Sequence, residues 1–135
     1  MTDVDVKAEF VRVLEHQRVQ GLAVQQSWFR GQLTAEANVL FLQLAPGSWL
    51  RFFFDAGVFF WRMVDAPDAG ERGDEDSEYR IVEAAPEGAM GTVSAVHFTA
   101  PDRDTVVLTI SFAGGAQLVL QNRDDRNTLL VSLTG

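Results

Sequence analysis

The sequence contains no cysteine, which excludes disulfide scaffolds, iron–sulfur clusters, cysteine zinc sites and thiol nucleophiles. Lysine occurs once, at Lys7, beside ten arginines. This bias is typical of GC-rich genomes and leads us to expect a bacterial, cytoplasmic protein. No apolar run approaches the roughly 20 residues that a membrane-spanning helix needs, so we expect no membrane partner. The first residues are acidic where a signal peptide carries basic ones.

The motifs of common catalytic and cofactor-binding sites are also missing. The chain has no G-x-S-x-G elbow, no phosphate-binding Walker loop, no G-x-G-x-x-G and no H-E-x-x-H. Its two histidines, His16 and His97, have no spacing suited to a chelate, and a structural role is the simpler interpretation of each. We therefore predict no catalytic residue, no metal site and no cofactor.

The charge balance is strongly acidic, with a net charge of −8 and a pI near 4.6. Affinity for nucleic acids depends on Lys and Arg side chains that neutralise phosphates, so we expect no nucleic-acid partner. The length of 135 residues suits a single domain that spans residues 1–135. Ten phenylalanines and three tryptophans supply enough apolar surface for a sizeable core.

Two hydrophobic periodicities divide the chain. Apolar residues recur with helical spacing from Val6 to Leu14, and Gly21 can take the positive φ of a helix C-terminus. We therefore predict a helix over residues 3–20. Over residues 22–133 the period becomes two, in segments joined by short turns that permit only antiparallel pairing. The predicted fold is α+β: one N-terminal helix packed on an antiparallel meander of seven to nine strands, strongly curved or barrel-like.

Side-chain parity sets the registers of the two C-terminal hairpins. A three-residue loop between the first two of these strands pairs Ile110 with Leu118 and keeps the apolar side chains of both strands on one face. It requires a glycine in the left-handed region, which Gly115 can supply. The last hairpin fits a four-residue loop and sets Leu120 opposite Leu129.

The segment over residues 49–64 is apolar on both faces, which is unusual for a hairpin with one face in water. A two-residue loop would set Arg51 directly opposite Arg62, so we predict a three-residue loop, which places Arg51 opposite Trp61 as a cation–π pair. This register gathers five candidate binding residues on one face: Trp49, Arg51, Phe53, Phe59 and Trp61. Three roles are open for that face: it packs under the helix, it lies at a partner or dimer interface, or it lines a pocket for an apolar ligand.

Residues 65–78 contain seven acidic residues and one arginine, a net charge of −6. Glycine, proline and serine accompany the acids, so we predict a mobile acidic loop. A solvated loop that aids solubility is the simplest interpretation, and attraction of a basic partner protein is the functional one. The candidate partner-binding residues of this loop are Asp68, Glu71, Asp74, Glu75 and Asp76. Tyr79 stands where an EF-hand calcium loop needs glycine, which excludes that motif.

Three functions are compatible with these features. We favour a small, acidic, non-enzymatic protein-binding module, such as an inhibitor or immunity-type protein that masks a basic partner. The first alternative is a ligand-binding curved sheet or barrel with an aromatic-lined pocket. The second is an enzyme with an unrecognised site that uses His97. A homodimer through the aromatic hairpin is compatible with all three.

Overall fold

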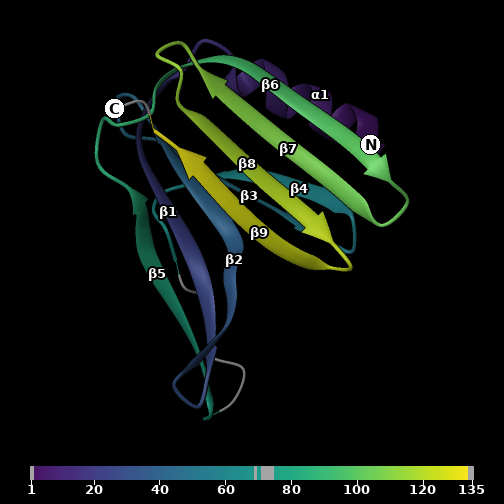
Figure 1. Cartoon of the computed structure of the whole chain (residues 1–135). Helices are drawn as coiled ribbons and strands as arrows, with labels where there is room; N and C mark the ends of the chain where they lie inside the picture. Colours follow the sequence, from purple (N-terminus) through teal and green to yellow (C-terminus); the bar gives the residue numbers. More distant parts are fainter. Residues whose placement is uncertain (1, 69, 71–74, 134–135) are drawn as a thin grey trace.

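A computed structural model describes residues 2–68, 70 and 75–133 of the chain (Figure 1). This part contains one α-helix, α1 (Asp3–Leu14), and nine β-strands. The strands are β1 (Arg18–Phe29), β2 (Gln32–Leu44), β3 (Trp49–Asp55), β4 (Val58–Val64), β5 (Ser77–Ala85), β6 (Gly91–Asp102), β7 (Thr105–Phe112), β8 (Gln117–Arg123) and β9 (Arg126–Ser132). All strand pairs are antiparallel, which confirms the predicted α+β class.

Strand β1 is the junction of the sheet. Its first residues, Arg18 and Val19, pair with β6, its remainder pairs with β5, and β2 pairs along its other edge. The strand order is β4-β3-β2-β1-β6-β7-β8-β9, with β5 beside β1. We call β1–β5 the first half-sheet and β6–β9 the second half-sheet. Within the described residues the end strands β4 and β9 do not pair, so the sheet curves without closing into the barrel that the prediction allowed.

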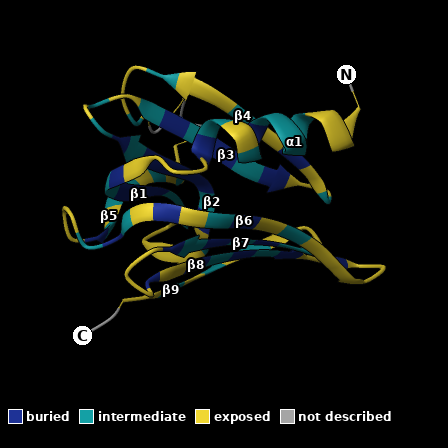
Figure 2. Cartoon of the chain, turned by 90° about the horizontal axis from the view of Figure 1, so that it is seen from above, coloured by how far each residue is buried: buried dark blue, intermediate teal, exposed yellow. Residues whose placement is uncertain are grey.

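The two half-sheets lie over each other with the hydrophobic core between them, and α1 covers the side where β4 and β6 approach it (Figure 2). Phe10 of α1 is fully buried, and its ring lies 4.8 Å from the ring of Phe59 and 6.0 Å from the ring of Phe98. The indole Nε1 of Trp61 donates a hydrogen bond of 3.0 Å to the carbonyl oxygen of Val6. Aromatic packing therefore joins the helix to both half-sheets.

A small polar network holds the open ends of the half-sheets together. The Nδ2 atom of Asn127 in β9 donates a hydrogen bond of 3.1 Å to the carbonyl oxygen of Phe54 in β3. Its Oδ1 atom accepts one of 3.1 Å from the buried amide of Asn122. Nearby, the backbone N–H of Ala56 donates a hydrogen bond of 2.7 Å to Oδ1 of Asp125. Because each of these polar atoms has a hydrogen-bond partner, the network stabilises the contact between the two half-sheets.

The predicted helix over residues 3–20 is too long. The helix ends at Leu14, and His16 takes a φ of 66°, which a continuing helix does not allow. The N–H of His16 donates a hydrogen bond of 3.1 Å to the carbonyl oxygen of Val93, at the start of β6. Pairing with a distant strand therefore ends the helix early, and Gly21, the predicted helix terminus, lies inside β1.

The registers of the two C-terminal hairpins are confirmed. Ile110 pairs with Leu118, and Gly115 has a φ of 100°, in the left-handed region that the three-residue loop requires. Leu120 faces Leu129 as predicted, although the strands extend further and leave a loop of two residues instead of four. Alternating burial therefore sets the register wherever only one face of the hairpin is apolar.

The β3–β4 hairpin has a different register from the predicted one. Asp55 pairs with Val58, and the loop of residues 56 and 57 has φ values of 50° and 81°. Positive φ at both loop positions is the type I′ geometry, whose twist matches that of the paired strands. Arg51 consequently lies opposite Arg62. Burial of one aromatic side chain contributes about 1.5–3 kcal/mol, which exceeds the roughly 0.2–1 kcal/mol of a cross-strand repulsion.

Candidate functional site

The first half-sheet has an outer face, turned away from the core, that carries a second apolar cluster. Ala23, Val39 and Phe41 are buried there, although no helix of the described chain covers them. Half-buried apolar side chains pack around these three, namely Trp49, Phe53, Val64 and Ile81. A solvated sheet face is normally polar, so the outer face has the composition of a binding surface.

Two arginines lie side by side on this outer face. Arg51 in β3 is directly opposite Arg62 in β4, and the Arg51 guanidinium lies 4.8 Å from the centre of the Phe53 ring. Partial burial and, to a smaller extent, the charge of Arg62 lower the pKa of Arg51. Among the described residues, neither arginine forms a hydrogen bond or an ion pair. Their donors are therefore available to a ligand.

The two arginines open into a cleft of about 590 Å³, which we call the arginine cleft. The half-buried Val64 and Pro67 supply apolar surface, the buried Phe41 lies beneath, and Gln25 also lines the cleft. Residues 65–68 together with Gly70, at the start of the acidic segment, complete the described lining. A Cβ atom at Gly70 would lie 3.7 Å from Nε2 of Gln25, which shows how closely this segment approaches β1. The cleft thus joins features that the sequence presents as separate, the hairpin and the acidic segment.

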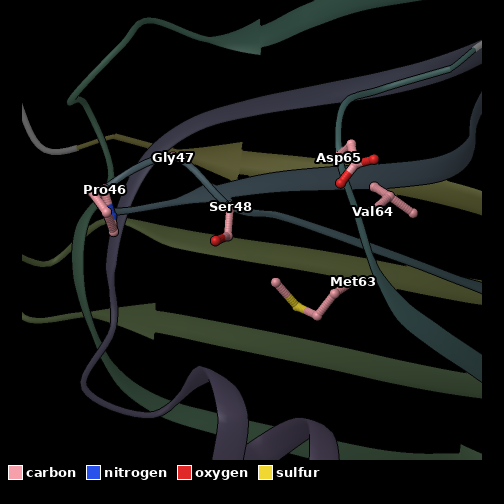
Figure 3. A pocket seen from close by; sticks show the side chains of 6 residues that line it. All are labelled: Pro46, Gly47, Ser48, Met63, Val64 and Asp65. Atoms are coloured by element: carbon pink, nitrogen blue, oxygen red, sulfur yellow. The ribbon is translucent and has the colours of Figure 1, made fainter.

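Two further hollows lie on the first half-sheet. One, of about 500 Å³, lies between the β2–β3 connection and the end of β4, and Figure 3 shows its six lining residues. Asp65 is the charged side chain among them, and it also lines the arginine cleft. The other, of about 340 Å³, includes Trp49 and Ile81. Among the described residues, neither lining contains an arginine, so neither offers the paired donors of the arginine cleft.

The predicted aromatic site is divided between the two faces of the hairpin. Trp49, Arg51 and Phe53 lie on the outer face, whereas Phe59 and Trp61 point to the core side and pack against α1. The expectation that all five share one face is wrong because the loop has two residues and not three. For the same reason Arg51 stacks on Phe53 and does not face Trp61.

The predicted acidic site is described only in part. Asp68 lines the arginine cleft, and its Oδ1 atom accepts a hydrogen bond of 2.8 Å from the N–H of Gly70. Glu75 is exposed, and Asp76 lies 3.4 Å from the guanidinium of Arg30. The segment ends earlier than predicted, because β5 begins at Ser77. Two predicted site residues, Glu71 and Asp74, lie outside the described residues.

The histidines do not form a site in the structure. His97 is exposed in the middle of β6 opposite Thr109, which settles the face that the sequence left open. His16 is exposed in the short connection between α1 and β1. In the described ranges no group of three or more His, Asp or Glu side chains is placed to hold a metal ion.

Sequence reasoning missed most of the arginine cleft. Gln25, Phe41 and Asp65 come from three separate segments, and no local pattern indicates that they meet. One signal was present, because Arg51 and Arg62 are placed symmetrically about a two-residue turn. The repulsion between Arg51 and Arg62 disfavours this register. The same concentration of positive charge makes the pair a candidate site.

Comparisons with known proteins give no independent assignment. No protein-family model, curated protein or solved structure matches the chain. Over residues 2–68, 70 and 75–133, the structure has no helix with the length and apolar composition needed to span a bilayer. The functional argument therefore depends on the geometry of the arginine cleft.

Proposed function

We propose that the protein is a non-enzymatic binding protein that holds a small organic acid in the arginine cleft by its carboxylate. One observation carries this proposal: Arg51 and Arg62 face each other in a cleft without an acidic partner among the described residues. Like charges directly opposite each other destabilise a sheet, so a ligand that neutralises them gains affinity from relief of that repulsion.

The chemistry of the cleft favours an organic anion over a simple ion. A guanidinium offers donors in a planar fork that matches a carboxylate, and such charge-assisted hydrogen bonds are among the strongest in proteins. The half-buried Val64 and Pro67 provide apolar surface for the carbon skeleton of the ligand. The volume of about 590 Å³ lies within the usual range for small-molecule sites.

This proposal develops the ligand-binding alternative, with the pocket on the outer face of the sheet. The hypothesis of a basic partner protein and that of a homodimer through the aromatic hairpin stay predictions. The acidic segment gives the partner hypothesis less support than its composition suggests, because Asp68 faces the arginine cleft and Asp76 lies beside Arg30.

Binding is tested by titrating the ¹⁵N-labelled protein with phenylacetate and following amide chemical shifts, with the uncharged analogue 2-phenylethanol as the ligand control. We expect saturable shifts that centre on β3 and β4 with phenylacetate and much smaller ones with the alcohol. Arg51→Gln should abolish the response, whereas Arg103→Gln, at the exposed β6–β7 turn, should keep it. Equal responses of the wild type and Arg51→Gln, or none at millimolar phenylacetate, would overturn the proposal.

A further inference from the structure

We infer that the ligand also carries a positive charge, and that the arginine cleft accepts a short peptide of two or three residues with free amino and carboxyl ends. This inference rests on the proposed function, because it assigns the carboxylate to Arg51 and Arg62. It adds a second subsite, at Asp65 and Asp68, for the ammonium group of the same ligand.

Among the described residues that line the cleft, positive and negative charges are equal in number. Two arginines stand on the sheet, and two aspartates belong to residues 65–68. A plain carboxylate in this cleft gains attraction from the arginines and meets repulsion from the aspartates. A ligand with separated positive and negative ends suits both pairs of side chains, which is electrostatic complementarity of the kind that gives specificity.

The opposite charges do not neutralise each other directly. Within the described chain, no nitrogen of Arg51 or Arg62 lies within 4.0 Å of an oxygen of Asp65 or Asp68. The hydrogen bond from the N–H of Gly70 fixes Oδ1 of Asp68, and its second carboxylate oxygen can accept from a ligand. The described lining therefore offers positive and negative side chains that are not paired with each other, as a dipolar ligand needs.

Size and shape favour a peptide over a free amino acid. A volume of about 590 Å³ corresponds to roughly twenty water molecules, more than one amino acid fills. The half-buried Val64 and Pro67 also line the cleft and suit an apolar C-terminal side chain.

The test compares three ligands by calorimetry and chemical-shift titration: alanyl-leucine, its N-acetyl form without the ammonium group, and its C-terminal amide without the carboxylate. We expect the free dipeptide to bind most tightly. Each modified form should bind about tenfold more weakly, or more weakly still. The double variant Asp65→Asn, Asp68→Asn should bind the free and N-acetyl dipeptides equally. Glu36→Gln, an exposed site outside the cleft, should keep the wild-type preference.

The outcomes separate this inference from the proposed function. If the N-acetyl dipeptide binds as tightly as the free one while the amide does not bind, the carboxylate site stands and the ammonium subsite is wrong. If the double variant keeps the tenfold preference for the free dipeptide, Asp65 and Asp68 are not the subsite. If none of the three ligands binds at millimolar concentration, the proposed function fails together with the inference.

Discussion

Replacement of Arg62 by glutamine tests whether the fold gives up stability to keep two arginines together. Arg51 and Arg62 are a directly opposed pair on neighbouring strands, and Arg51 is half-buried. Glutamine keeps much of the side-chain length and removes the charge. We therefore expect Arg62→Gln to unfold at a higher urea concentration than the wild type, although it weakens carboxylate binding.

The size of the effect follows from the geometry of the pair. The Cβ atoms of directly opposed residues lie about 5 Å apart, and for guanidinium groups that splay away from each other we take a separation of about 8 Å. At that distance and an effective dielectric constant of about 40, two unit charges repel by about 1 kcal/mol. At 0.1 M salt the Debye length is about 10 Å, which reduces the repulsion to about 0.5 kcal/mol.

The assay is urea unfolding followed by tryptophan fluorescence at 10 mM and 500 mM NaCl. Arg62→Gln should raise the free energy of unfolding by roughly 0.5–1 kcal/mol at low salt, and the gain should nearly vanish at high salt. Arg62→Glu should gain more, because it converts the repulsion with Arg51 into attraction. Arg103→Gln, an exposed arginine in a turn, controls for the loss of one positive charge. A destabilised Arg62→Gln variant at both salt concentrations would refute the reasoning.

Two further predictions concern the fold. Phe10→Ala should lower the free energy of unfolding in urea by about 3–5 kcal/mol, because it leaves a cavity among buried rings. The control Val4→Ala, on the exposed face of α1, should change it by less than about 0.5 kcal/mol. Similar losses for both variants would contradict the assignment of Phe10 to the core. Gly115→Ala should lower the melting temperature, because φ is 100° at this position. Gly114→Ala should leave it unchanged, because a Cβ there meets open space and φ is not positive. Equal melting temperatures of the two variants would count against the left-handed loop.

The parts of the fold that the sequence predicted are those in which local information is sufficient. In β7 and β8 one face is apolar and the other is mostly polar, so a shift by one residue would expose Ile110 and Leu118. The β3–β4 hairpin is apolar on both faces, and parity therefore carries no information about its register. The predicted register was chosen to avoid the repulsion between Arg51 and Arg62. That repulsion is weaker than the stabilisation that the two-residue turn and the burial of Phe59 give to the observed register.

The other errors have a non-local cause. Nothing near Leu14 ends the helix, because the apolar spacing and the charges suit a longer one. The end is set by hydrogen bonding of His16 to Val93 in a strand far along the chain. The arginine cleft also has a non-local origin, because Gln25 and Phe41 lie beside the arginines only when β1, β2 and β3 are paired. Side chains that meet through such pairing leave no spacing signal in the sequence.

The position of β1 at the junction of the two half-sheets has a consequence for folding during translation. Val19 pairs with Gly91, and a ribosome that adds 5–20 residues per second needs roughly 4–14 s to make the roughly 70 residues between them. Until β5 (Ser77–Ala85) is made, β1 has only β2 beside it, and its other edge is open to pairing with another nascent chain. Arg18 and Val19 on that edge wait longer, because their partner is β6. The contacts between Asn127 and Phe54 and between Asp125 and Ala56 form later still, so completion of the core awaits the last strands synthesised.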